Sequence, residues 1–122
     1  MSARVRGIRG ATTLDVDAIE QMHERVPELI LAMMTANDLD FDDIVSVVFN
    51  ATSDITSGFP AAAARLLDLA DTPLLDVQEM SVPGSLPRAV RVLMHVYTER
   101  SKVDVEHVYL RGADILRPDL TS

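Results

Sequence analysis

The sequence predicts a single α/β domain built on a largely parallel or mixed β-sheet. With 122 residues, 48% of them apolar and 25% charged, the chain has the length and composition of one globular domain with one core. Short segments rich in β-branched residues alternate along it with segments whose apolar residues recur at helical period. Strands that alternate with helices indicate the α/β class.

The N-terminal part predicts a strand followed by a long helix. Residues 4–12 are interrupted by glycines, which favours a strand over a helix. Asp17 and Glu20 have the spacing of a capping box, and the apolar period after them predicts a helix as far as about Asn37. Pro27 falls inside this helix and removes a backbone hydrogen bond, so we expect a kink or a helix in two pieces.

The middle of the chain predicts a strand, a helix and another strand. Residues 44–51 (IVSVVFNA) are apolar and β-branched enough for a buried strand. The alanine-rich residues 60–70 predict a short helix with proline in its first turn. Residues 73–79 (PLLDVQE) predict a third strand.

The C-terminal third predicts a loop, a helix and a final extended part. Proline and glycine place the loop at residues 83–87. We expect a helix over residues 86–97, because four apolar residues there share one helical face: Val90, Leu93, Met94 and Tyr97. Residues 107–110 predict the last strand, and residues 114–116 are a candidate for another extended segment.

Charge and composition exclude several classes of function. A net charge of −8 works against binding nucleic acid or an anionic membrane surface, because both depend on clustered positive charge. The apolar stretches are shorter than the roughly 20 residues of a membrane helix, and the N-terminal arginines are not followed by the apolar run of a secretory signal. The chain has no cysteine for a disulfide, a thiolate nucleophile or a cysteine metal site. The cytoplasm is the expected location.

Standard catalytic and cofactor motifs are missing from the sequence. The glycines of residues 6–10 lack the spacing of a phosphate-binding loop. The three histidines lack the spacing of metal ligands, so we expect no metal site. Asp76 and Glu79 resemble a carboxylate pair, but three residues apart on a strand they should point to opposite faces.

Arginine is the residue type that stands out. All of the eleven basic residues except Lys102 are arginine, which a composition bias explains better than a demand for planar bidentate donors. Each isolated arginine is more often a solvated surface charge than a ligand. Several polar residues nevertheless lie on helices or near strand ends, where α/β sheets bind ligands: Arg9, Arg65, Arg91, Arg117, Glu79 and Tyr109. Considered alone, the residues indicate an anion-binding α/β domain.

Four segments together resemble a known family. They are RGIRGATT at residues 6–13, FPAAAAR at 59–65, QEMSVPGSLPRAVRVLMHV at 78–96 and HVYLRGADILRPDL at 107–120. In order and spacing, over nearly the whole chain, they resemble the small monofunctional chorismate mutases of the Bacillus type. Three independent signals agree: the RGxRGATT opening, the arginine twelve residues after the glutamate of QEM, and the LRPDL ending.

The resemblance implies a fold and an assembly. A single domain over residues 1–122 would have a mixed α+β fold with helices packed on one face of the sheet. Three subunits would form a homotrimer around a barrel-like core, with a site in each cleft between neighbours. A site shared between chains would explain why no single segment looks complete. The tail from about residue 115, which includes Leu116 and Arg117, is expected to be flexible and to order over the bound ligand.

The implied reaction is the cofactor-free pericyclic rearrangement of chorismate to prephenate, in phenylalanine and tyrosine biosynthesis. By the family's pattern, Arg9 holds the side-chain carboxylate of the substrate with help from the Tyr109 hydroxyl. Arg91 donates to the ether oxygen as that oxygen becomes negative. Glu79 faces the ring hydroxyl, near the positive charge that develops on the ring. The resemblance implies neither a metal nor a cofactor.

The entrance of the implied site differs from the family's pattern at two positions. Phe59 and Arg65 are implied to line this entrance from the adjoining subunit. Ala62 stands where the family often has lysine, so Arg65 is expected to contribute more to attracting the anionic substrate. Asp76 stands where the family often has cysteine, and it is a candidate for substrate binding.

Two other functions stay open at this point. The same pocket could bind prephenate or an aromatic amino acid as a metabolite-sensing module without catalysis. A trimeric imine deaminase has a comparable fold and a similar interface arginine. The usual cysteine of that family is absent here, and neither RGxRGATT nor LRPDL belongs to it.

Overall fold

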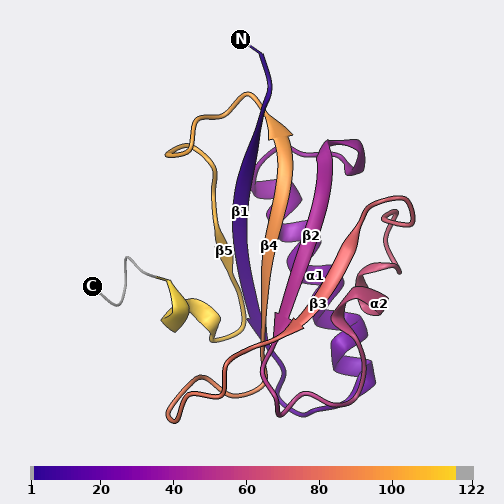
Figure 1. Ribbon diagram of the computed structural model, residues 1–122, viewed down its shortest axis with the longest axis vertical. Coiled ribbons are helices and arrows are strands. Elements are labelled where there is room, and N and C mark those ends of the chain that lie inside the picture. The colour runs from indigo at the N-terminus through magenta and orange to yellow at the C-terminus, as the bar shows by residue number, and fades with distance from the viewer. Residues whose placement is uncertain (1, 118–122) are drawn as a thin grey trace.

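The computed structural model describes residues 2–117, which form a five-stranded sheet and two α-helices (Figure 1). The elements are β1 (Arg4–Thr13), α1 (Ile19–Ala36), β2 (Ile44–Ala51), α2 (Pro60–Ala64), β3 (Leu74–Gln78), β4 (Ala89–Thr98) and β5 (Val108–Tyr109), with 3-10 helices at Phe41–Asp43 and Ala113–Leu116. Within this part of the chain, no helix has the length and apolar composition needed to cross a membrane. Residues 118–122, part of the expected tail, lie outside the described residues.

The sheet is mixed, as predicted. Its strand order is β3-β2-β4-β1-β5. The central strand, β4, is antiparallel to both of its neighbours, β1 and β2. The two edge strands are parallel to their neighbours, β3 to β2 and β5 to β1.

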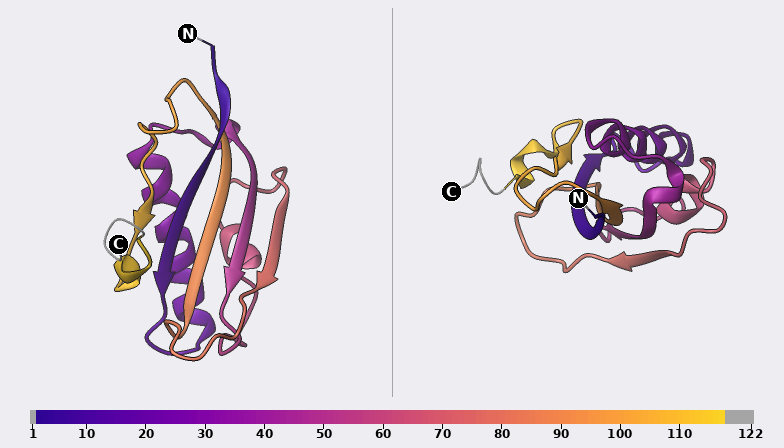
Figure 2. Two further views of the ribbon diagram at one scale, coloured as in Figure 1. Left: turned by 60° about the vertical axis from the view of Figure 1, so that its left-hand side comes forward. Right: turned by 90° about the horizontal axis from the view of Figure 1, so that it is seen from above.

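Both α-helices cover one face of the sheet, as the resemblance implies. Figures 1 and 2 show α1 and α2 on the same side of the strands. Alternate residues of the strands, such as Ile8, Phe49 and Val92, are buried toward α1, whose buried face includes Met22, Leu29, Ile30 and Met33. The intervening residues of the strands therefore point to the other face, which neither helix covers.

The helix predicted over residues 86–97 is wrong, because this segment forms β4. Val90, Val92, Met94 and Val96 are buried while the residues between them are more exposed, a period of two. This strand is central and pairs along its whole length with β1 and over most of it with β2. The long-range pairing and the β-branched valines override the weak helical period of the segment.

The long helix α1 is continuous through Pro27, so the alternative of two separate helices is wrong. The capping box is also wrong, because Ala18 is the N-cap residue and makes no side-chain capping bond. Asp17 instead accepts hydrogen bonds from Thr56 and Ser57. The carboxylate thereby ties the start of α1 to the loop that precedes α2.

Two further predicted segments differ from the structure. The helix expected over residues 60–70 ends at Ala64, after which backbone bonds of the i to i−3 type form tight turns and Leu69 becomes fully buried. Residues 114–116 are part of a 3-10 helix rather than an extended segment. The reason is the turn before them, where Arg111 and Gly112 both have left-handed backbone angles.

Candidate active site

Side chains from four strands form a row across the uncovered face of the sheet. Tyr109 pairs with Ala11, Ala11 pairs with Arg91, and Arg91 pairs with Asn50. Paired residues point to the same face, and so does Arg9, two positions before Ala11 on β1. The register therefore brings Arg9, Arg91 and Tyr109 together, although Arg9 lies near the N-terminus and the other two lie in the last third of the sequence.

Glu79 joins this group by an ion pair with Arg91. The Nε atom of Arg91 lies 3.4 Å from Oε2 of Glu79. The amide of Glu79 donates to the Ala51 carbonyl at 2.9 Å, which continues the pairing of β3 with β2 and fixes this backbone. The Arg91 side chain is 50% exposed and that of Glu79 is 23% exposed. The Arg91 guanidinium and the Glu79 carboxylate thus lie side by side, and the guanidinium is exposed enough to contact a ligand.

The backbone that carries Arg9 is held by His107. The amide of Arg9 donates to Nδ1 of His107 at 2.9 Å, just before β5 begins. Burial, and to a smaller extent the charge of Arg9, lowers the pKa of the His107 imidazole. A neutral imidazole keeps Nδ1 available as an acceptor, so this contact does not change near neutral pH.

The segment after Tyr109 is anchored to α1 by Arg111. Its guanidinium donates twice to Glu28, from Nε at 3.0 Å and from Nη2 at 2.8 Å. The carbonyl of Arg111 accepts a hydrogen bond from the Thr13 hydroxyl. These bonds fix the start of the 3-10 helix Ala113–Leu116; its last residue, Leu116, and the following Arg117 are half-buried. The anchored segment lies at the β5 edge of the sheet (Figure 1).

The other predicted site residues form a second group at α2. Phe59 is 69% exposed and borders a cavity of about 390 Å³ together with Asp76. Oδ1 of Asp76 accepts the amide hydrogen of Ala61 at 3.0 Å. Burial raises the pKa of the Asp76 carboxyl, while the Ala61 amide and the charge of Arg65 act in the opposite direction. As predicted, Asp76 and Glu79 do not meet, since one faces α2 and the other faces Arg91.

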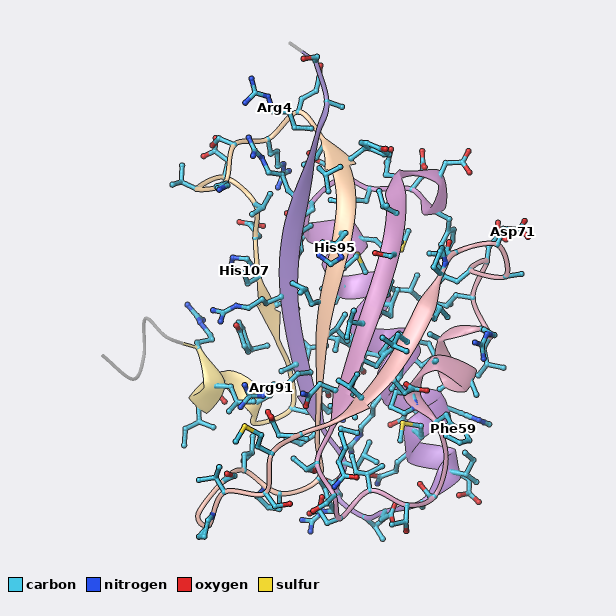
Figure 3. The ribbon with its side chains drawn as sticks, in the orientation of Figure 1. Arg4, Phe59, Asp71, Arg91, His95 and His107 are labelled. Carbon is cyan, nitrogen blue, oxygen red and sulfur yellow. The ribbon has the colours of Figure 1, made fainter. Side chains whose placement is uncertain are left out.

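The chain holds these two groups apart. Arg9, Arg91 and Tyr109 lie on the uncovered face, whereas Phe59 and Arg65 belong to the helix layer behind the sheet. In Figure 3 the labelled Arg91 and Phe59 are on different sides of the molecule. The two groups therefore do not meet within one chain.

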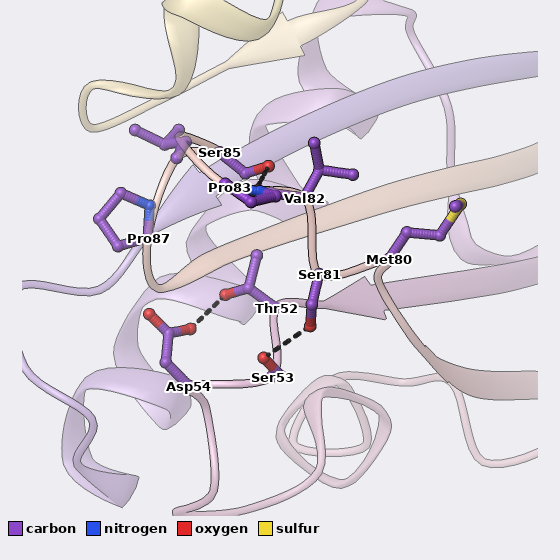
Figure 4. A pocket seen from close by; sticks show the side chains of 10 residues that line it. Thr52, Ser53, Asp54, Met80, Ser81, Val82, Pro83, Ser85 and Pro87 are labelled. Carbon is purple, nitrogen blue, oxygen red and sulfur yellow. Dashed lines mark hydrogen bonds between the residues drawn. The ribbon is translucent and has the colours of Figure 1, made fainter.

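Two loops at the end of the sheet position the start of β4 and border a cavity of about 380 Å³ (Figure 4). The hydroxyls of Ser53 and Ser81 lie 3.2 Å apart and link the loops. The Thr52 hydroxyl donates to Asp54 and accepts the amide hydrogen of Ala89 at 3.0 Å. Asp54 also accepts the amide hydrogen of Arg88 at 2.9 Å. These bonds fix the strand that carries Arg91 three residues later.

Residues 5–120 match the family model "Chorismate mutase type I". The chain belongs to this family. It is 48% identical over 119 residues to "Chorismate mutase AroH" of Thermus thermophilus, covering 97% of this chain and 98% of that protein. It is 37% identical over 118 residues to "Chorismate mutase AroH" of Bacillus subtilis (strain 168), covering 96% and 93%. The resemblance to the chorismate mutases seen in the four sequence segments is thereby confirmed.

A solved chorismate mutase structure has the same fold. "Chorismate mutase from Clostridium thermocellum Cth-682" superimposes with a TM-score of 0.88 at 41% sequence identity. The likeness covers 90% of this chain and 98% of that one. The mixed α+β fold of the chorismate mutases, with its helices on one face, is therefore the fold of this chain.

Sequence reasoning missed one polar residue in the row that this chorismate mutase displays. Asn50 lies on β2, paired with Arg91 on one side and with Val77 on the other. Its Oδ1 atom is buried and has no hydrogen-bond partner among the described residues. The sequence signal for Asn50 was an amide in a mostly apolar strand, IVSVVFNA. Its meaning depends on the pairing with β4, which the sequence did not predict.

Proposed function

We propose that this chain is a chorismate mutase whose active site is completed by a neighbouring subunit of a homotrimer. The observation that carries the proposal is the Arg91–Glu79 pair, 3.4 Å apart on the same sheet face as Arg9 and Tyr109. The reaction is the rearrangement of chorismate to prephenate, an isomerisation in the biosynthesis of phenylalanine and tyrosine. As a prediction from the sequence, we place the enzyme in the cytoplasm.

The reaction needs positioning and electrostatics rather than acid–base chemistry. One carbon–oxygen bond breaks while one carbon–carbon bond forms, no proton moves, and no covalent enzyme intermediate is required. Negative charge grows on the ether oxygen and positive charge grows on the ring. A fixed cation and a fixed anion, each beside the atom whose charge it opposes, stabilise this transition state more than the ground state. Arg91 and Glu79 have these signs.

Arg9 and Tyr109 supply the second requirement, which is to hold the substrate in its folded, reactive shape. Chorismate carries two carboxylates, and a guanidinium binds a carboxylate with two parallel hydrogen bonds. Arg9 binds the side-chain carboxylate, and the Tyr109 hydroxyl donates to the same group. Holding the two reacting ends of the substrate in contact removes much of the entropic part of the barrier.

The second group of site residues comes from the neighbouring subunit. Phe59, Arg65 and Asp76 lie with α2, away from the face that carries Arg91, so a copy that presents its α2 region to this face completes the site. Apolar side chains exposed on the uncovered face support association there, among them Val5, Leu75, Leu93 and Tyr97. Three copies joined in this way surround a barrel-like core with three equivalent sites.

The rim of the site binds the anionic substrate on entry. Arg65 comes from the neighbour, and Leu116 and Arg117 come from the segment that Arg111 anchors. Ala62 offers no charge where the family often has lysine, so Arg65 contributes most of the attraction at the neighbour's side of the entrance. Asp76 contacts the ring hydroxyl, either by its second carboxylate oxygen or through the backbone beside it.

The test is the loss of chorismate absorbance with purified protein, in buffer that contains a chelator and no cofactor. We expect turnover at a rate that is nearly constant across neutral pH, because no group of the site must change protonation. Failure to turn over millimolar chorismate would contradict the proposal. In that case, thermal stabilisation by prephenate would indicate a regulatory module, and activity on 2-aminoacrylate would indicate an imine deaminase.

A further inference from the structure

We propose that Asn50 is a positioning residue, whose side-chain amide oxygen holds the guanidinium of Arg91 in the orientation that meets the substrate. This role rests on the proposed function, since it concerns the same site. Three observations carry it: the place of Asn50 under the ion pair, its unsatisfied oxygen, and the neutrality of its amide.

Asn50 lies beneath the Arg91–Glu79 pair. The strand order places β2 between β4, which carries Arg91, and β3, which Glu79 directly follows. The two side chains meet at 3.4 Å and must therefore cross β2. They cross it at Asn50, which pairs with Arg91 on one side and with Val77, two residues before Glu79, on the other. Neighbouring Phe49 is fully buried toward the helices, so Asn50 points to the site.

The oxygen of Asn50 lacks the partner that a buried polar atom normally has. Oδ1 is buried, and no hydrogen bond reaches it from any described residue. The other polar side chain on this face of β2 is different, because the Ser46 hydroxyl lies 3.1 Å from Nδ1 of His95. An unpaired buried acceptor weakens a fold, and an apolar side chain of the same shape would avoid that cost. The amide oxygen is therefore placed to accept a hydrogen bond that forms when substrate occupies the site.

Arg91 is the donor that the geometry offers. In the chain without substrate its Nε faces Glu79 at 3.4 Å, long for a hydrogen bond. When Glu79 turns to the ring hydroxyl of the substrate, one N–H group of Arg91 donates to Oδ1 of Asn50 and another donates to the ether oxygen. Two bonds fix the plane of the guanidinium, whereas one leaves it free to rotate.

The neutrality of the amide suits this position. A carboxylate at residue 50 would also accept from Arg91, but it would compete with the ether oxygen for the positive charge. An amide oxygen orients the guanidinium and leaves its charge for the transition state. The expected order of kcat is therefore wild type, then Asn50→Leu, then Asn50→Asp.

The experiment compares kcat and KM for chorismate in the wild type, Asn50→Leu and Asn50→Asp, with Asn50→Ser as the variant that restores a neutral acceptor. We expect kcat to fall about tenfold in Asn50→Leu, the effect of one lost hydrogen bond, with KM within about twofold and an unchanged or higher melting temperature. Asn50→Ser should recover part of kcat. A purely structural role would lower the melting temperature instead of kcat.

Ser46→Ala is the matched control, because it removes a polar group from the same face of β2 without touching Arg91. It should keep wild-type kcat. Wild-type kcat in Asn50→Leu, or in Asn50→Asp if the leucine variant does not fold, would overturn the role of Asn50 and leave the proposed function standing. Lack of turnover by the wild-type protein would overturn both.

Discussion

At the scale of single residues, Arg91 is the group on which the proposed mechanism depends most. It lies on a central strand, its Nε atom is 3.4 Å from Oε2 of Glu79, and its side chain is 50% exposed. A planar guanidinium can donate to the ether oxygen from one N–H group while a second N–H group donates to Oδ1 of Asn50. The shorter ammonium of a lysine carries the same charge but cannot make both contacts in one plane.

We therefore expect Arg91→Lys to fold normally and to lose most of its activity. A preorganised donor of this kind is typically worth about 3 kcal/mol in the transition state, so kcat should fall about 100-fold or more. The thermal midpoint should hardly change, because the side chain is half exposed. Chorismate absorbance gives kcat, and circular dichroism gives the fold. A variant with near-wild-type kcat would remove Arg91 from this role.

At the scale of elements, the packing of β1 on α1 sets the position of Arg9. Gly10 faces the helix, and a Cβ atom there would lie 2.4 Å from Sδ of Met33 and 3.2 Å from Cδ1 of Leu29. Both side chains are fully buried, so neither can move away without disturbing the core. Glycine at this position lets the strand that carries Arg9 approach the helix closely.

Gly10→Ala should therefore destabilise the protein by about 1–3 kcal/mol through overpacking. The matched control is Gly7→Ala, because a Cβ atom at Gly7 meets only Cδ1 of Leu93 at an ordinary 3.5 Å. Urea denaturation of both variants measures the difference in the free energy of unfolding. Equal stability of the two alanine variants would show that β1 and α1 are not packed as tightly as described.

The hydrogen bonds of Asp17 that join the start of α1 to the loop before α2 should make the stability of the protein depend on pH in the acid range. Hydrogen bonds from Thr56, and next from Ser57, lower the pKa of the Asp17 carboxyl from its ordinary 3.8 to about 2. A folded-state pKa below the unfolded value adds stability that is complete above about pH 4 and is lost as the pH falls toward 2.

Asp17→Asn should thus lose stability less steeply than the wild type between pH 5 and pH 2. The comparison of melting temperatures of the two proteins over this range isolates Asp17 from the other carboxylates. Parallel curves for the two proteins would mean that Asp17 is not held by these bonds in solution.

Most elements could be predicted from local pattern, but β4 could not. Its residues Val90, Leu93, Met94 and Tyr97 fit a helical face, and Val90, Val92, Met94 and Val96 fit one face of a strand equally well. The choice between them is made by β1 and β2, which lie far away in the sequence and pair with both sides of β4. The capping box failed for a related reason, since the Asp17 carboxylate is used by the distant Thr56 and Ser57.

The site could be predicted only in part, and mainly from the family resemblance. Arg9, Glu79, Arg91 and Tyr109 are far apart in the sequence, and their meeting on one face follows from strand register rather than from local spacing. Asn50 escaped prediction because its importance comes from its pairing with Arg91. The role of a residue that acts through neighbours on other strands is difficult to predict from a single sequence, because the strand pairing must be known first.

At the scale of the whole molecule, the proposed function requires one chain to carry two halves of different sites. Arg9, Arg91 and Tyr109 on the uncovered sheet face form one half, and Phe59 and Arg65 at α2 form the other. A homotrimer in which each α2 region meets the uncovered face of the next subunit contains three complete sites. In such a ring, a defect in one half can be complemented by a subunit whose defect is in the other half.

The activity of mixed trimers shows whether two subunits share each site. Arg91→Ala inactivates the sheet half, and the double variant Phe59→Ala with Arg65→Glu inactivates the α2 half, so each protein alone should have little activity. The two are co-expressed with different tags and isolated by both tags in succession. Every mixed trimer then contains one site with two intact halves, and we predict about one third of wild-type kcat per trimer. Activity no higher than that of the two variants alone would contradict a site shared between subunits.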